Sequence, residues 1–283
     1  MQRLSHFESN SHFGINFNAM ITLKSAILVI LIAGFLLETL LDMVNLRHRK
    51  AGIPDEMQGY LDSDKYQKSQ EYHRVVTRFG LITGTISLLS TVALIQFGGF
   101  GWLDEQLRSI TDEPILLALL FFGVLYLVSD VLTLPFQYYR TFVIEEKFGF
   151  NQTTFKTFIT DKIKGYLLAS LIGLPILALF IFLLESMGKD FWWVFWIVIG
   201  LFSVVMNLMY TSVILPLFNK LTPLEEGELL DAIRAYCEKV QFPIRKVYVI
   251  DGSKRSKKSN AFFSGFGKQK KVVLYDTLIE NHN

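Results

Sequence analysis

The stretch Arg255–Leu278, RSKKSNAFFSGFGKQKKVVLYDTL, carries more structural information than any other part of the sequence. Aromatic and small residues mix from Asn260 to Phe266, and a lysine-rich turn, Gly267–Lys271, follows. Val272–Tyr275 is a run of strand-forming residues. This order predicts a β-hairpin with strands of about five residues each. The pattern alone fits a hairpin that closes a small domain, and it excludes a phosphate loop because no Gly-Lys-Ser/Thr follows.

Further motifs accompany the hairpin in a fixed order along the chain. The residues concerned are Ser259–Phe263, Gly265-Phe266 and Val272–Leu278 in the hairpin, and Leu46-Arg47-His48, Glu146–Asn151 and Leu215–Leu224 before it. Together these motifs resemble the Ste24-type CAAX prenyl proteases, integral-membrane zinc metallopeptidases of the M48 family. The resemblance covers most of the chain after about residue 40.

The zinc motif of that family is missing. In the family, a helix carrying H-E-x-x-H follows the D-T-L segment, and a glutamate ligand comes later. This sequence contains no H-E-x-x-H, and none of its histidines has a spacing that could replace it: His6, His12, His48, His73 and His282. We therefore expect an N-terminal portion of such a protease, ending before the metal site and inactive alone. Zinc is expected for the family, but we assign no catalytic residue and no metal ligand to this chain.

The resemblance also implies a substrate-binding edge within the hairpin. It would consist of Asn260, Ala261, Phe262 and Phe263, with Asn260 able to bond the peptide backbone. Extended peptides are often held by main-chain pairing to an exposed strand. The activity implied is cleavage near the C-terminus of prenylated CAAX proteins, so the implied partner is a prenylated CAAX protein or peptide.

Composition points to a membrane protein independently of the resemblance. Of the 283 residues, 51% are hydrophobic and 19% are charged, against about 25% charged in a typical soluble domain. The net charge of +2 is too small to indicate a nucleic-acid partner. A single cysteine, Cys237, excludes an intramolecular disulfide.

Five apolar segments are each long enough to cross a bilayer core of about 30 Å. They lie near residues 26–46, 79–97, 114–134, 165–184 and 191–214. A very short turn, Met187–Asp190, joins the last two, which predicts an antiparallel helical pair. Three tryptophans open the fifth segment and suit the aromatic belt of a membrane interface: Trp192, Trp193 and Trp196.

The distribution of lysine and arginine predicts the orientation. Outside the five segments these residues number 2, 7, 1, 5, 1 and 12 from the N-terminal tail to the C-terminal tail. Cytoplasmic loops carry the excess of positive charge, so this alternation predicts an external or lumenal N-terminus and a cytoplasmic C-terminus. The membrane would be the inner membrane of a bacterium or the endoplasmic reticulum of a eukaryote.

Three acidic residues fall within the predicted spans, where a charge is costly. Glu38 and Asp42 are four residues apart on the first span, and Asp130 lies late in the third. They either line a water-filled cavity or reach toward a span end and pair with a cation such as Arg47 or Arg49. For Asp42 and Asp130 the second interpretation is favoured, and for Glu38 the two remain open.

The chain turns polar after the last span. Thr222–Glu225 matches a capping box with proline at the first helical position, which predicts an amphipathic helix to about Gln241. Lys246–Ile250 is expected as a strand, and the basic loop Lys254–Lys258 as a solvated surface. The predicted divisions are a polar tail (1–20), a transmembrane domain (21–218) and a cytoplasmic helix plus hairpin that begins an incomplete peptidase domain (219–283).

The sequence therefore predicts a mostly α, polytopic transmembrane helical protein with a small cytoplasmic α+β segment at its C-terminus. Its function by resemblance is that of a membrane zinc metalloendopeptidase of the CAAX-processing type. One alternative is a non-catalytic membrane module that binds an extended or isoprenylated peptide. A second alternative, a small membrane transporter, rests only on the intramembrane acids, and the lack of repeated halves argues against it.

Overall fold

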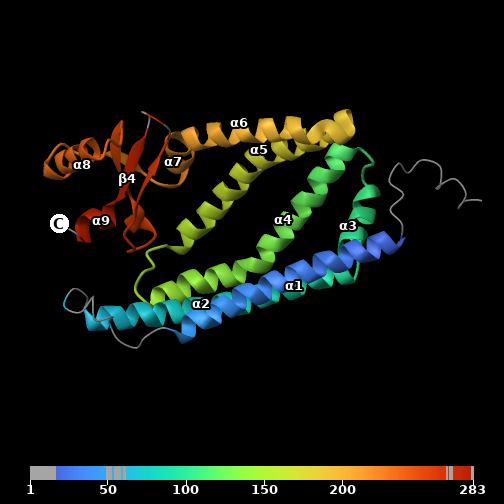
Figure 1. The fold of residues 1–283 in the computed structure, drawn as a ribbon, viewed down its shortest axis with the longest axis horizontal. Coiled ribbons are helices and arrows are strands. Elements are labelled where there is room, and N and C mark those ends of the chain that lie inside the picture. Colours follow the sequence, from blue (N-terminus) through green and yellow to red (C-terminus); the bar gives the residue numbers. More distant parts are fainter. Residues whose placement is uncertain are drawn as a thin grey trace, which may run out of the picture. The chain divides into compact units, whose positions relative to one another are not determined.

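The computed structural model describes residues 17–48, 53, 59, 62–265, 267 and 270–281, with side chains from Thr22 onward. Figure 1 shows long helices followed by a small sheet with short helices around it. The chain forms two compact units, residues 1–106 and 107–283. The predicted architecture, a helical membrane protein with a small α+β segment at the C-terminus, is confirmed.

The first unit is a pair of antiparallel helices, α1 (Phe17–Arg47) and α2 (Ser63–Gln96). The Lys24 Nζ near the start of α1 donates to the carbonyl of Gln96 at the end of α2, at 3.3 Å. Gly84 lets the helices approach closely, since a Cβ there would lie 3.3 Å from the Phe35 ring. A short helix, α3 (Gly99–Arg108), follows and was not predicted from the sequence.

The N-terminus of α2 is capped by Asp62. Its carboxylate accepts from the backbone N–H groups of Asp64 and Lys65, both at 2.9 Å. The bond from the Lys65 N–H lowers the pKa of Asp62, because it favours the charged carboxylate. The polar start of α2 thus extends the helix well before the predicted span at residue 79.

The membrane helices of the second unit are α4 (Pro114–Tyr139), α5 (Phe155–Met187) and α6 (Phe191–Met209). The π-helix η2 (Arg140–Glu145) continues α4. The π-helix η4 (Tyr210–Ile214) and then α7 (Leu215–Phe218) continue α6. α4 ends beyond its predicted apolar segment and α5 begins and ends beyond its own, because polar turns extend these helices out of the apolar region.

Within the described residues, four continuous helical stretches are long and apolar enough to span a membrane. The longest, Phe155–Phe218, reverses at the 3₁₀ turn η3 (Gly188–Asp190), where Gly188 has φ +54°. Phe180 on α5 packs edge-on against Phe191 and Phe195 on α6, so the two helices form the predicted antiparallel pair. In the described part of the chain, α1, α2, α4, α5 and α6 are therefore the five helices that correspond to the predicted spans.

The C-terminal sheet has four strands in the order β1-β2-β4-β3. They are β1 (Leu221–Pro223), β2 (Lys246–Ile250), β3 (Ala261–Ser264) and β4 (Lys271–Tyr275). β1 pairs antiparallel with β2, β2 parallel with β4, and β3 antiparallel with β4. The predicted strand at 246–250 and the predicted hairpin are both confirmed, the hairpin with strands of four and five residues.

Two small hydrophobic cores hold the sheet in place. On one side, Ile250 and Val273 pack with Leu215, which belongs to the helix that leaves the membrane. On the other, Val247 and Leu274 pack against α8 (Glu228–Lys239) through Leu230. The short helices η5 (Gly252–Lys254) and α9 (Asp276–Asn281) complete this part. The end of the membrane domain is thus part of the sheet's own core.

The predicted capping box at Thr222–Glu225 is wrong. Thr222 and Pro223 lie in β1 opposite Val249 and Tyr248, and the helix begins only at Glu228. This segment forms a strand instead of starting a helix. Proline is tolerated in it because β1 is an edge strand, where the missing N–H of proline removes no hydrogen bond between strands. The helix ends at Lys239, since Gln241 has a left-handed φ of +53°.

An exposed ion pair supports the approach to α8. The Arg234 guanidinium donates to both carboxylate oxygens of Glu226, at 2.7 and 3.1 Å. The hydrogen bonds from Arg234 lower the pKa of Glu226. The pair therefore contributes stability above the ordinary pKa of a glutamate, and that contribution is lost as the pH falls through the lowered value.

Replacing Gly252 by alanine is expected to destabilise the sheet. A Cβ at this buried position would overlap the Tyr275 ring, which packs against the core of Ile250 and Val273. Overpacking of this kind costs about 1–3 kcal/mol. Thermal unfolding of the purified protein should show a lower midpoint for Gly252→Ala. Gly200→Ala, on α6 with open space around its Cβ position, is the matched control. Equal midpoints for the two variants would contradict this packing.

Candidate functional site

The strand β3 leaves one edge of the sheet open. It is the last strand in the order β1-β2-β4-β3 and pairs only with β4 in the described sheet. The Tyr275 N–H donates to the Asn260 carbonyl at 3.0 Å, and Ala261 lies opposite Leu274. Backbone groups alternate in direction along an antiparallel strand, so those of Ala261 and Phe263 point away from β4. These groups form an edge to which an extended chain can pair.

The four predicted site residues therefore lie together, but their side chains face different surroundings. Phe262 packs on the core of Leu215, Ile250 and Val273, with its ring 6.3 Å from that of Tyr210. Phe263 is 61% exposed and meets the Phe242 ring edge-on at 5.3 Å. Phe262 thus anchors the strand, while Ala261 and Phe263 present its outer edge.

The Asn260 side chain covers one backbone group of this edge. Its Oδ1 accepts from the outward-pointing N–H of Ala261 at 2.8 Å. A peptide carbonyl that bonds to Ala261 must therefore displace this oxygen. In this structure the Asn260 side chain bonds to its own chain. That it bonds the backbone of a peptide stays a prediction.

Contacts from the last membrane helix hold the hairpin in position. The hydroxyl groups of Thr211 and Ser264 are in hydrogen-bond contact, and the Lys271 Nζ donates to the Ser212 Oγ at 2.6 Å. Thr211 and Ser212 both lie in the π-helix η4. Hydrophobic periodicity cannot reveal such a wide turn, so this attachment could not be predicted from the sequence.

A second attachment holds the loop that leads into β3. Arg255 Nε and Nη2 donate to the two carboxylate oxygens of Asp161 on α5, at 2.7 and 2.9 Å. Nη2 also donates to the carbonyl of Phe218 at the end of α7, at 2.7 Å. The Arg255 carbonyl accepts from Gln152 N and from Thr153 Oγ1, at 3.0 and 3.1 Å. We name these contacts of Arg255 the Arg255 clamp.

The prediction of a solvated basic loop is wrong for one of its residues, Arg255, while Lys258 is exposed as predicted and also makes specific contacts. Arg255 is a partly buried member of the clamp. Lys258 pairs with Glu145 at 2.7 Å and lies over the Phe150 ring. Lys254 and Lys257 are exposed, as predicted. The motif Glu146–Asn151 borders these contacts, and an isolated bridge pairs Asn151 with Ser256. Two motifs far apart in sequence therefore meet in one junction.

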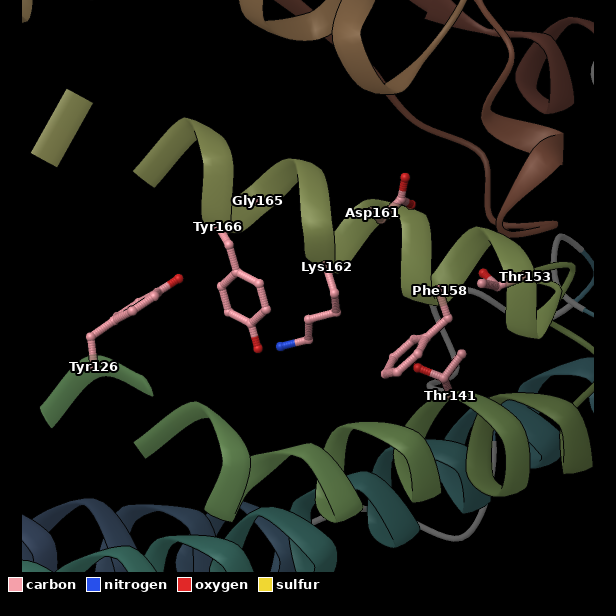
Figure 2. A pocket seen from close by; sticks show the side chains of 8 residues that line it. All are labelled: Tyr126, Thr141, Thr153, Phe158, Asp161, Lys162, Gly165 and Tyr166. Carbon is pink, nitrogen blue, oxygen red and sulfur yellow. The ribbon is translucent and has the colours of Figure 1, made fainter. Parts of the chain in front are cut away.

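A polar cluster lies between α4 and α5. Asp130 accepts from Lys162 Nζ at 2.6 Å, from the Tyr166 hydroxyl, and from Gln137 Nε2 at 3.4 Å. The adjoining pocket has a volume of about 330 Å³ and is lined by Tyr126, Thr141, Thr153, Phe158, Asp161, Lys162, Gly165 and Tyr166. In Figure 2, Lys162 and Tyr166 point from α5 toward α4, while the Asp161 carboxylate points away from them.

The three acidic residues within the predicted spans have different surroundings in the structure. Asp130 pairs with a cation, as favoured, although the partner is Lys162 rather than an arginine of the first connection. Glu38 is exposed and Asp42 is partly exposed on α1. No ion pair with Arg47 is found for either among the described residues, and Arg49 lies outside them. Of the three, Asp130 alone is built into a defined polar site.

No group of three or more His, Cys, Asp or Glu side chains in the described part of the chain could hold a metal ion. His48 and His73 bond within their own segments, to the carbonyl of Val44 and the hydroxyl of Thr77. His6, His12 and His282 lie outside the described residues. The side chains in place do not fit a zinc site, so we derive no chemical step through a metal.

Comparison with known proteins identifies the family to which this chain belongs. Residues 42–220 match the family model described as CAAX prenyl protease N-terminal, five membrane helices. Residues 223–283 match the model of peptidase family M48. The chain belongs to the M48 CAAX prenyl proteases. The strands β2, β4 and β3, with the open edge, therefore fall within the part that matches the peptidase model.

The relatives extend the same conclusion over most of the chain. CAAX prenyl protease 1 homologues from Oryza sativa subsp. japonica and Homo sapiens are each 36% identical, over 263 and 238 residues. These matches cover 90% and 82% of this chain, and 62% and 50% of the relatives. The crystal structure of Ste24p from S. mikatae aligns with a TM-score of 0.82 at 36% identity, covering 90% of this chain and 62% of that one. The chain thus spans about half to three fifths of these relatives' length.

Breaking the Arg255 clamp is expected to loosen the junction between the sheet and α5. We expect Arg255→Ala and Asp161→Asn each to lower the unfolding midpoint. Because the two side chains bond directly, their combination should be non-additive, with a coupling of about 0.5–3 kcal/mol. A double-mutant cycle by thermal unfolding measures this term. Purely additive effects would mean that the pair does not hold the loop.

Proposed function

We propose that this chain forms the membrane and substrate-binding portion of a zinc metalloendopeptidase that cleaves near the C-terminus of prenylated CAAX proteins. Family membership supports this proposal, as do the names of its relatives. The observation that carries it is the outward-pointing backbone of Ala261 and Phe263 on the last strand of the sheet. This edge can hold an extended peptide next to where the rest of the peptidase domain would supply its chemistry.

In that reaction these residues would bind the substrate and orient its backbone. Main-chain pairing to β3 would hold the substrate backbone straight and fix its register. The Arg255 clamp and the contacts of Ser264 and Lys271 would keep this strand fixed against the membrane helices. A bound zinc ion would supply the activation of water in such a peptidase. Its ligands would come from residues that are not among these 283.

The orientation in the membrane is part of the proposal. The alternating lysine and arginine counts favour an external or lumenal N-terminus and a cytoplasmic sheet. The exposed Trp192, Trp193 and Trp196 at the start of α6 suit an interface on the opposite side. The divisions 1–20, 21–218 and 219–283 follow this orientation, with the endoplasmic reticulum as the site in a eukaryote and the inner membrane in a bacterium.

A non-catalytic module that binds an extended or isoprenylated peptide is the second candidate. The same β3 edge, with its outward-pointing backbone groups, would serve it. A transporter has less support, because Asp130 is engaged by Lys162 and Tyr166 rather than left for an ion. The two leading candidates share a binding edge and differ only in catalysis.

The substitution Phe263→Pro tests whether a peptide pairs with the edge of β3. Phe263→Pro removes an outward N–H and leaves the bonds between β3 and β4 in place, whereas Phe263→Ala keeps that N–H. A backbone hydrogen bond contributes about 0.5–1.5 kcal/mol, so we expect Phe263→Pro to bind an extended peptide about two- to tenfold more weakly than Phe263→Ala. Fluorescence anisotropy with a labelled peptide and protein in nanodiscs measures the difference.

Asn260→Ala is measured in the same assay. We expect tighter binding, because this variant removes the oxygen that a peptide carbonyl must displace from the Ala261 N–H. Weaker binding would instead show that the Asn260 amide bonds the peptide. Equal affinities for Phe263→Pro and Phe263→Ala would remove the edge itself from the proposal.

The zinc content of the purified chain tests whether the chain is catalytic alone. We expect the purified 283-residue chain to retain far less than one zinc per chain after dialysis with added zinc. We also expect no chelator-sensitive cleavage of a prenylated peptide. Inductively coupled plasma mass spectrometry and a cleavage assay check both points. About one tightly held zinc per chain would show a metal site that these residues are not expected to form.

A further inference from the structure

An apolar groove runs between α4 and α5. Its volume is about 700 Å³, and its walls include Leu120, Gly123 and Leu127 from α4 and Ala169, Gly173 and Leu177 from α5. A Cβ at Gly123 or Gly173 would meet nothing within 4 Å, so these two positions open onto empty space. Both helices are membrane-spanning segments by length and composition. The groove therefore suits a hydrocarbon chain.

One end of this groove is polar. Tyr126 and Tyr166 line both the groove and the pocket of Figure 2. Their rings meet edge-on, with centroids 6.2 Å apart. Beyond them lie Lys162, Thr141 and Thr153. An occupant would thus have an apolar body among the leucines and a polar end at the two tyrosines.

The polar pocket connects to the substrate edge through the Arg255 clamp. Asp161 and Thr153 line the pocket and both bond to Arg255. Asn260 comes five residues after Arg255, and β3 begins at Ala261. A fully extended chain advances at most about 3.6 Å per residue, so Arg255 and Asn260 are at most about 18 Å apart. The clamp, which borders the pocket, therefore lies within about 18 Å of the start of the edge.

The charges at the polar end favour a neutral group over a phosphate. Among the residues that line the pocket, Lys162 is the one cation, and Asp130 holds it at 2.6 Å. The anion Asp161 is held by Arg255 in the same way. A phospholipid headgroup would have to compete with Asp130 for this lysine. A thioether and its neighbouring amides carry no charge and need only the hydroxyls and the tyrosines.

We propose that the α4/α5 groove binds the isoprenyl chain of a prenylated peptide, with the modified residue in the polar pocket and the peptide backbone continuing to β3. This inference rests on the proposed function and adds the location of the lipid. It explains why one series of contacts joins an intramembrane groove, a neutral polar pocket and an open strand edge. The residues that set the preference for a lipidated substrate are then those of the groove.

Filling the groove tests this assignment. Two peptides of one sequence are compared, the first with farnesyl and the second with methyl on the same cysteine. In nanodiscs the unmodified protein should bind the farnesylated peptide more than about tenfold tighter, because a buried hydrocarbon chain adds about 0.8 kcal/mol per methylene. Gly173→Leu should reduce this ratio to about twofold or less. Gly200→Leu, a helical glycine on α6 outside the groove, should leave it unchanged.

The methylated peptide separates this inference from the proposed function. Its affinity depends on the β3 edge and should be the same in all variants. A farnesyl preference that survives both Gly173→Leu and Gly123→Leu, which fill opposite walls, would overturn the groove assignment and leave the edge intact. Failure of the unmodified protein to bind either peptide would overturn the proposed function as well.

Photo-crosslinking identifies the occupant directly. A peptide with a diazirine in its farnesyl chain should label residues 116–127 and 169–177, and excess farnesylated peptide should abolish the labelling. The methylated peptide should not compete. Labelling outside these segments would overturn the assignment. So would labelling of the groove by a diazirine phospholipid that the farnesylated peptide fails to displace, since the groove would then be a lipid site.

Discussion

The arrangement of the second unit depends on the bidentate pairing of Arg255 with Asp161. A planar guanidinium and a carboxylate match in shape, so this contact fixes direction as well as distance. The same guanidinium reaches the carbonyl of Phe218, so one side chain joins the loop before β3, the start of α5 and the end of α7. The sheet is thereby attached to two membrane helices by a polar contact in addition to the core around Leu215.

Charged side chains are also paired inside the helical region. Asp130 is satisfied by Lys162 and Tyr166, and each charged residue that lines the adjoining pocket has an opposite partner. An unpaired charge among apolar helices would be costly. Pairing leaves the polar pocket neutral while keeping hydroxyl groups in its wall. That combination suits recognition of uncharged polar groups rather than transport of an ion.

Local patterns in the sequence were sufficient to predict the five membrane helices, the reversal at Gly188 and the hairpin. Each of these depends on apolar length or on residues close together in the chain. The capping box at Thr222 failed because pairing with β2, some 26 residues later, outweighed a local helix signal. The clamp of Arg255 to Asp161 joins residues 94 apart. Nothing near either residue indicates its partner, so one sequence alone could not reveal the junction that positions the candidate site.

The two edges of the sheet differ in what they can bind. β1 ends in Pro223, which has no N–H, and the strand is three residues long. β3 instead presents the outward backbone groups of Ala261 and Phe263, with Phe262 anchored in the core behind them. Exposed edges invite pairing with any extended chain, and natural proteins usually block them. This sheet blocks one edge with proline and keeps the other short and firmly attached, so an added strand can enter on one side only. That asymmetry leaves the backbone of β3 as the open side of the sheet, at a fixed position relative to the helices α5 and α7.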